Sequence, residues 1–437
     1  MYRLLLSACF VLVSLAVFAQ SAPRTYRIKA GSLFDSETGT FRKGLSVLVK
    51  GTTIEAVKTE AELTEAEKKD YTLIDLSAYT LLPGLIDAHT HLLSESKLYQ
   101  GNADPALSYL RDVNLHTDAY RALYGAARAK TALEGGITAV QDLGNSGIFA
   151  DVALRDAING GLIPGPRMRC SGPGLSTEGG QFPGLIYEQQ HIASKEYRIV
   201  KSVDDAIQAV RENLTQKADV IKIYSDNAPN PTMLSLEEMR AIVAEAHRYG
   251  VRVTAHAVTN TSVYNAVMAG VDGIEHGYQV HDTTLQLMAR KGVVWVPTFA
   301  DSVSFEKAMT IMNPNNPNIR RNVGARIKSI SELMQKAVKA NVTIVAGADD
   351  YTVLGFPYGE MFKRTLFMYH TAGMTIPHVL QTATINAARH LRWENRIGSI
   401  KKGFWADIIA VDPAIEKDLN VLLNVRFVMK GGVVIKQ

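Results

Sequence analysis

Several polar residues follow or interrupt apolar stretches of the chain, and their types suit metal binding. The first two, His89 and His91, come directly after the apolar stretch 81–88. Side chains two residues apart in an extended chain face the same way, so both imidazoles can reach one metal ion. Two surface histidines that follow a strand would give the same pattern. Alone, this pair is a weak signal for a metal site.

Lys222 lies inside another apolar stretch, residues 220–224. Burial of an unpaired ammonium is costly and lowers the pKa of the lysine. A neutral lysine amine can react with carbon dioxide to form a carbamate, and a carbamate can bridge two metal ions. The alternative is a lysine at a strand end whose amine reaches solvent, which the position alone slightly favours.

His256 and His276 each end a strand-like stretch, residues 251–256 and 273–276. One helix-like segment separates the two stretches, so we expect the histidines at neighbouring strand ends. Either one alone would more often be a hydrogen-bonded core histidine. Because each closes a strand, the two together favour a second group of metal ligands.

Asp349 follows the apolar stretch 342–348, where a carboxylate could reach the same centre. An acid after a strand and a glycine is often only a loop cap. Asp350 is the fallback if Asp349 faces elsewhere.

These residues need a scaffold that brings many strand ends together. The middle of the chain alternates strand-like and helix-like stretches, and 235–247 is a clear amphipathic helix with a capping box at Ser235 and Glu238. Such alternation favours a parallel sheet, and eight units close a barrel with its active face at the carboxyl ends of the strands. We therefore predict an α/β protein built on a TIM-like (β/α)8 barrel. The strand candidates are residues 81–89, 136–143, 167–171, 219–224, 251–256, 273–276, 293–299 and 342–347.

Both ends of the chain are rich in short strand-like pieces, and the last two of these are separated by Gly431 and Gly432, as in a hairpin. This pattern predicts a small β-sandwich module assembled from both termini. We assign residues 20–80 and 396–437 to that module and residues 81–395 to the metal-dependent barrel.

The first 19 residues are typical of a signal peptide. Arg3 precedes an apolar run over residues 4–18, and small residues at 17 and 19 fit a cleavage site. We therefore expect export to the periplasm or the medium. A retained anchor and a lipoprotein processed at Cys9 are less favoured alternatives. After cleavage only Cys170 would remain, which excludes an internal disulfide.

Composition narrows the classes of partner. The chain has 437 residues, 46% of them hydrophobic and 21% charged, and its formal net charge is only +4. Scattered basic residues argue against a nucleic-acid partner. No apolar run after the signal is long enough to span a membrane. We expect a small-molecule or dipeptide substrate, and a homo-oligomer stays open.

The motifs PGLIDAHTHL, VIKIY, VTAHA, GIEHG and GADD occur in that order. The ordered set resembles the amidohydrolase superfamily, and within it the imidazolonepropionase-like branch related to Xaa-Pro dipeptidases. The resemblance implies that one metal is held by His89, His91 and Asp349 and a second by His256 and His276. It implies that Lys222, as a carbamate, bridges the two.

Two departures from related dipeptidases fall in segments that line the substrate-binding site in those enzymes. Those enzymes often carry a histidine where this chain has Gln181, and a Ser-Gly-Gly where it has residues 225–227. Gln181 and Tyr224 are therefore candidates for substrate binding, although barrel packing would explain Tyr224 equally well.

The expected activity is hydrolysis of amide bonds in dipeptides or N-acyl amino acids by a hydroxide that two divalent metal ions hold. Zinc fits the nitrogen-rich donors, as do other transition metals. Asp349 would be the catalytic proton carrier. Alternatives are a hydrolase of a lactone, ester or cyclic amide, and a deaminase, although deaminases usually use one metal and Lys222 argues against that. A binding protein on a degenerate barrel is disfavoured because no ligand of the set is missing.

Overall fold

The computed structural model of the protein describes residues 24–101 and 105–437. The expected signal peptide and the alternative at Cys9 lie outside these residues. Within the described part of the chain, no helix is both long and apolar enough to cross a membrane.

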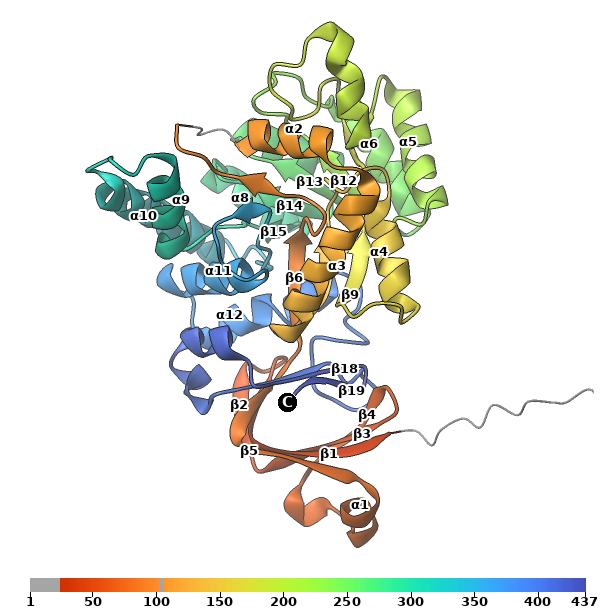
Figure 1. Ribbon diagram of the computed structural model, residues 1–437, viewed down its shortest axis with the longest axis vertical. Helices are drawn as coiled ribbons and strands as arrows, with labels where there is room; N and C mark the ends of the chain where they lie inside the picture. The colour runs from red at the N-terminus through yellow and green to blue at the C-terminus, as the bar shows by residue number, and fades with distance from the viewer. Residues whose placement is uncertain (1–23, 102–104) are drawn as a thin grey trace, which may run out of the picture.

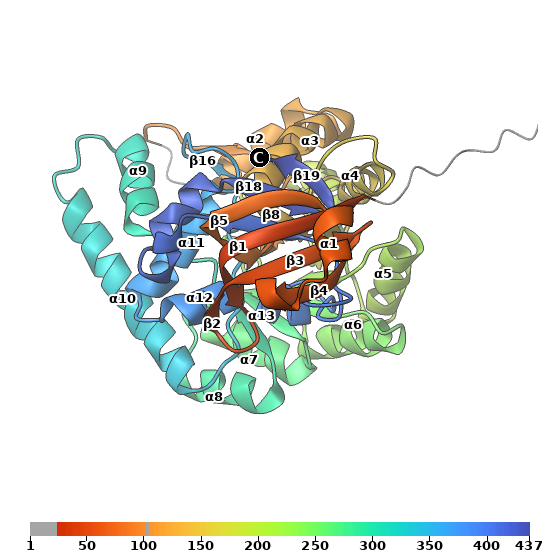
Figure 2. The ribbon, with the colours of Figure 1, turned by 90° about the horizontal axis from the view of Figure 1, so that it is seen from below.

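Both termini contribute to one sheet beneath the barrel (Figures 1 and 2). The order is β19-β18-β17-β5-β1-β3-β4, with β2 added beside β1. The two faces of the predicted sandwich are thus parts of one continuous sheet, which encloses its own apolar core that includes Val47, Leu81 and Ile408. The predicted hairpin at Gly431 and Gly432 is present as β18 and β19. The strands are β1 (Thr25–Asp35), β2 (Thr40–Lys43), β3 (Leu45–Lys50), β4 (Thr53–Thr59), β5 (Thr72–Pro83), β17 (Ile408–Val411), β18 (Phe427–Lys430) and β19 (Val433–Lys436), and the short helix α1 (Glu65–Asp70) lies between β4 and β5.

The chain passes from this sheet into the barrel at Gly84. Strand β5 continues to Pro83 and pairs with β17, and the first barrel strand, β6 (Leu85–Thr90), begins directly after the glycine. A Cβ atom at Gly84 would lie 2.1 Å from the Thr138 hydroxyl, so only glycine fits here. Residues 81–83, which the sequence placed in the first barrel strand, therefore belong to the sheet.

The barrel is closed by parallel strands. Ladders join β6, β8 and β9, and then β10, β12, β13, β14 and β15. Strands β9 and β10 follow one another in the third position, between β8 and β12, so the extended segment 342–348 takes the eighth. On one side the Val345 backbone N–H donates to the Trp295 carbonyl at 2.9 Å. On the other side the Ala88 backbone N–H donates to the Ala346 carbonyl at 3.0 Å. The predicted barrel is confirmed, although its last member is not a regular strand. The strands are β8 (Ile137–Asp142), β9 (Arg167–Cys170), β10 (Gly174–Ser176), β12 (Ile221–Tyr224), β13 (Val253–Ala257), β14 (Gly273–His276) and β15 (Val294–Val296).

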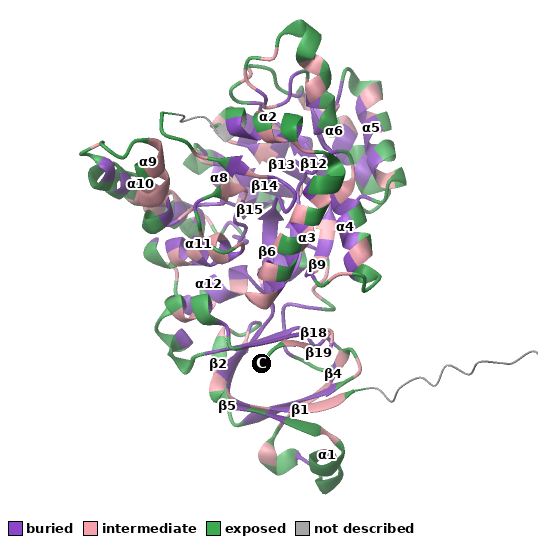
Figure 3. Cartoon of the chain, in the orientation of Figure 1, coloured by how far each residue is buried: buried purple, intermediate pink, exposed green. Residues whose placement is uncertain are grey.

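Amphipathic helices surround these strands and bury their apolar faces against them (Figure 3). Helix α6 begins with the predicted capping box, in which the Glu238 backbone N–H donates to the Ser235 hydroxyl at 3.1 Å. The helices are α2 (Pro105–Leu115), α3 (Asp118–Glu134), α4 (Ala150–Asn159), α5 (Val203–Thr215), α6 (Leu236–Arg248), α7 (Asn260–Ala269), α8 (Asp282–Lys291), α9 (Ser302–Met312), α10 (Ile319–Lys339), α11 (Glu360–Thr371), α12 (Ile376–Thr382) and α13 (Ile385–His390). Short strands β7 (Ser96–Lys97), β11 (Tyr197–Ile199) and β16 (Thr352–Val353) lie in the loops above the barrel.

Candidate metal centre

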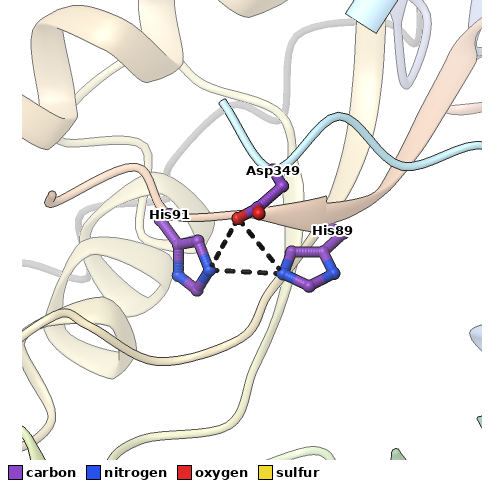
Figure 4. Close-up of side chains that lie close together, drawn as sticks. All are labelled: His89, His91 and Asp349. Atoms are coloured by element: carbon purple, nitrogen blue, oxygen red, sulfur yellow. Dashed lines mark hydrogen bonds and ion pairs between the residues drawn. The ribbon is translucent and has the colours of Figure 1, made fainter. Parts of the chain in front are cut away.

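Three of the predicted ligands converge at the carboxyl ends of neighbouring barrel members. The Nε2 atoms of His89 and His91 lie 3.2 Å apart, and Asp349 Oδ1 lies 3.5 Å from the first and 3.2 Å from the second (Figure 4). His89 and His91 lie at and just beyond the end of β6, and Asp349 follows the adjacent segment 342–348. Their ligand atoms all lie within 4.8 Å of one another. We call these residues the first group.

Hydrogen bonds fix both imidazoles of the first group. His89 Nδ1 donates to Glu275 Oε2 at 2.6 Å, and His91 Nδ1 donates to the Gly144 carbonyl at 2.8 Å. Each bond holds its ring so that Nε2 lies beside the other two ligand atoms. When Nδ1 of a neutral imidazole donates, Nε2 carries the lone pair, so two ring nitrogens and a carboxylate oxygen converge on one point, as they do around a bound cation. Such outer partners are typical of metal-binding histidines.

The ionisation of the first group also suits a metal. Burial, followed by the charge of Lys222, holds the pKa of His89 well below its ordinary value. Burial alone would raise the pKa of Asp349, but its neighbours His89 and then His91 lower it overall. The imidazole is therefore neutral and the carboxylate ionised, which are the forms that bind metal.

His256 and His276 form the second group. They lie at the ends of the paired strands β13 and β14, as predicted, and the centroids of their rings are 4.6 Å apart. His256 Nε2 lies 3.2 Å from Asp226 Oδ1, and His276 Nδ1 lies 2.9 Å from the Thr298 hydroxyl. These contacts involve Nε2 of His256 and Nδ1 of His276, which leaves the other nitrogen of each ring as the candidate ligand atom.

Lys222 shares a cavity of about 180 Å³ with both groups. Its side chain is buried, and its ammonium lies 5.5 Å from the centroid of the Tyr224 ring. Burial lowers the pKa of this lysine against the raising effect of Glu275 and Asp349. The alternative of a solvent-facing lysine is therefore wrong, and a buried amine of lowered pKa fits the predicted carbamate. The cavity is lined by His91, Asn145, Gln181, Lys222, Tyr224, His256, His276, Tyr278, Asp349 and Tyr351.

Left-handed backbone turns the ends of two strands toward this cavity. His276 has φ +71° and Asp349 has φ +55°, values that residues other than glycine rarely adopt. Strained backbone of this kind often occurs at functional sites, where the surroundings hold it in place. Asp350 has an ordinary conformation, and its carboxylate instead accepts a bond from the Gly359 N–H at 3.4 Å. The structure therefore favours Asp349 over the fallback Asp350.

Both predicted substrate-binding residues line the same cavity. The side-chain amide of Gln181 lies 3.0 Å from His256 Nε2. The Tyr224 hydroxyl donates to Asn145 Oδ1 at 3.2 Å, and its ring packs edge-on against Tyr197 at 5.1 Å. Tyr224 thus borders the cavity and packs within the barrel at once, so its role in binding stays a prediction.

Sequence reasoning missed two carboxylates that hold the histidines. Glu275 is fully buried within β14 and bonds His89, and Asp226 follows β12 and pairs with His256. A signal for Glu275 was present, because an acid inside an apolar parallel strand must be paired. Asp226 was noted only as a departure from the related dipeptidases.

Comparisons with known proteins agree with this geometry. Residues 80–435 match the amidohydrolase family. An ochratoxinase from Aspergillus niger is 28% identical over 388 residues, which span 82% of this chain and 75% of that protein. An imidazolonepropionase from Solibacter usitatus is 24% identical over 81% of each chain.

Solved structures are similar across nearly the whole chain. The crystal structure of a Xaa-Pro dipeptidase with methionine bound in its active site has a TM-score of 0.79 and 28% identity, covering 94% of this chain and all of that one (100%). The crystal structure of the A. niger ochratoxinase has a TM-score of 0.78 and 26% identity, covering 95% and 96%. With the barrel, the converging donors and the family match over most of its length, this chain belongs to the amidohydrolase family and is a hydrolase that acts on carbon–nitrogen bonds.

Proposed function

We propose that this protein is an exported, binuclear amidohydrolase that releases an amino acid from dipeptides or N-acyl amino acids. The observation that carries the proposal is the shared cavity. It holds parts of two groups of metal donors, a buried lysine of lowered pKa and an ionised aspartate. An α/β barrel places its active site at this end of its strands.

The residues present fit two divalent metals. The first group, His89, His91 and Asp349, would hold one ion, and the second group, His256 and His276, the other. Lys222 would bridge them as a carbamate, because its buried side chain lines the cavity that residues of both groups also line. Zinc suits nitrogen and oxygen donors, but other transition metals accept the same set. Such metals supply Lewis-acid polarisation of a carbonyl and a nucleophile at neutral pH.

Asp349 is the residue placed to move protons. Its Oδ1 lies 3.2 Å from His91 Nε2 in the first group, and its Oδ2 lies 3.9 Å from His276 Nδ1 in the second. An ionised carboxylate in this position accepts a proton from the nucleophile and then donates it to the leaving nitrogen. Amide cleavage needs an acid at that step, because an amine anion is a poor leaving group.

The size of the cavity and the relatives support a small amide substrate. A volume of about 180 Å³ next to the metal donors suits an amino-acid-sized group rather than a long peptide. The A. niger relative is named an ochratoxinase, and the dipeptidase structure holds methionine. Support for export comes from Arg3 and the apolar stretch 4–18.

The test is hydrolysis of a library of dipeptides and N-acyl amino acids, with released amino acid as the readout. The protein is stripped of metal and then reloaded with zinc, and the stripped protein is the control. We expect release by the loaded form alone. A silent library with two metals bound per chain would overturn the proposed substrates.

A further inference from the structure

The cavity that Lys222 shares with both groups of metal donors is called the metal cavity below. A second cavity of about 180 Å³ adjoins it. The two share Asp349 and Tyr351 as lining residues. Together they reach the lower part of the ~300–1,000 Å³ range of small-molecule sites. The metal cavity alone falls below that range, so a substrate that uses the neighbouring cavity would be held better.

The neighbouring cavity differs in chemistry from the metal cavity. Phe305 and Ala308 of α9, Met361 of α11 and the loop residues Ala300 and Leu354 give it an apolar wall. The metal cavity, by contrast, is lined by histidines, tyrosines and side-chain amides.

Two polar side chains of the neighbouring cavity already have partners. The Ser304 hydroxyl donates to Asp301 Oδ1 at 2.7 Å, and the Thr298 hydroxyl lies 2.9 Å from His276 Nδ1. Asp349 and Asp350 are the charged residues that line it, and both are acids. A ligand group that enters there therefore meets apolar surface and, among the described lining residues, no cation.

Helix α9 is unusual among the helices around the barrel. Its sequence, SVSFEKAMTIM, is mostly apolar, yet Ser304 is its sole buried residue. Figure 3 accordingly shows α9 mainly in the colours of intermediate and exposed residues. Phe305 and Ala308 are only partly buried, at the position where they line the cavity. Apolar surface left open next to a site is typical of a surface that a ligand covers.

We infer that this neighbouring cavity is a side-chain subsite, and that the substrate carries an apolar side chain or acyl chain beside its scissile amide. The inference rests on the proposed function, because it assigns the cavity to the same substrate. An apolar group in the cavity would cover Phe305 and Ala308 while the amide lies among the metal donors. Asp349, which borders both cavities, is then next to the bond that breaks.

The test fills the cavity and asks whether preference for apolar groups is lost. Ala308→Trp adds a large side chain to the lining, and Val303→Trp adds the same one at a position on α9 that is 48% exposed and outside the lining. Wild type should prefer N-acetylleucine over N-acetylglycine, or N-octanoylglycine over N-acetylglycine, by roughly tenfold or more in kcat/KM, since one methylene in an apolar pocket is worth ~10–200-fold. The pair that shows the preference tells which side of the amide the subsite serves.

Ala308→Trp should reduce that preference by about tenfold or more, toward equality, and Val303→Trp should keep the wild-type ratio. If Ala308→Trp does not fold, as judged by thermal unfolding, Phe305→Ala gives the second measurement, because a wider cavity should shift the preference to longer chains. No preference in wild type, or a ratio that neither cavity variant alters, overturns the inference.

A failure of the proposed function is recognised separately. If zinc-loaded protein cleaves none of these compounds, their binding is measured by calorimetry. Tighter binding of the apolar member, lost in Ala308→Trp and kept in Val303→Trp, upholds the subsite although the reaction is different. Equal binding of all members rejects it.

Discussion

The two groups of metal donors are built differently. In the first group the ligand atoms already lie within 4.8 Å of one another, and two hydrogen bonds fix the rings. The second group, His256 and His276, has a ring separation of 4.6 Å and forms no comparable cluster of three donors among the described residues. Its third predicted ligand is Lys222, which becomes a ligand only after it reacts.

This difference suggests that the first group is preorganised, whereas the second is completed by chemistry on Lys222. A preformed group holds metal without further change, whereas a group that needs a carbamate depends on carbon dioxide. We therefore expect the two sites to respond separately to substitution, and five variants test this.

Asp349→Asn should have the largest effect. The amide keeps an oxygen for the first metal but cannot carry a proton, so kcat should fall by ~10²–10⁴-fold, the range for loss of a general acid–base. Metal content, measured by mass spectrometry, should stay close to that of wild type. Near wild-type turnover would show that Asp349 is not the proton carrier.

Lys222→Ala should remove the predicted bridge. Loss of a direct ligand should lower activity by at least the ~100-fold that loss of an outer partner can cost. The second metal should be lost and the first retained. Small carboxylic acids, which can stand in for the carbamate, should restore part of the activity. Two bound metals and full activity in this variant would refute the bridge.

Glu275→Gln and Asp226→Asn form a matched pair. Each removes the charge of a carboxylate that contacts a ligand histidine, His89 in the first group and His256 in the second. Each should weaken its own metal by ~10–100-fold. Titration with a chelator, followed by metal analysis, should therefore show in each variant one ion that is released early and one that is retained. Equal weakening of both metals by either change would show that the groups act as one unit.

Gly347→Ala should have the smallest effect. A Cβ atom there would lie 2.5 Å from Val296 Cγ1 and 2.7 Å from His89 Cβ, so the segment 342–348 must move away from the first group. Such overpacking costs ~1–3 kcal/mol of stability. Gly324→Ala, on α10 with open space around it, is the control and should not destabilise. Denaturant unfolding measures the stability of both variants, and equal stability would contradict the close packing of Gly347 against Val296 and His89.

Much of the barrel could be predicted because its strands are apolar runs that end at histidines or an aspartate. His256 and His276 were placed correctly at neighbouring strand ends for that reason. The break at Gly84 was not predicted, because residues 81–88 read as one apolar run although their halves serve two sheets. Periodicity cannot show where a strand changes partners.

The candidate site could be predicted less completely. The ligand types and their order along the chain indicate a metal centre, and the structure brings those residues together. Glu275 was missed because its role depends on a contact across the barrel, 186 positions from His89, which no local pattern encodes. The helix-rich stretch 302–328 can be expected to shape the pocket, but the apolar wall that α9 contributes cannot be predicted, since a helix of apolar residues normally indicates core.

The position of β17 bears on how the chain folds during synthesis. This strand lies between β5 and β18 and pairs with residues 80–83, so the entire barrel is made before β5 acquires its partner on that edge. Until then the edge of β5 is an open template for pairing with another chain. A chaperone that shields this edge, or a truncation that removes β17, would consequently decide between folding and aggregation more strongly than changes at the metal centre.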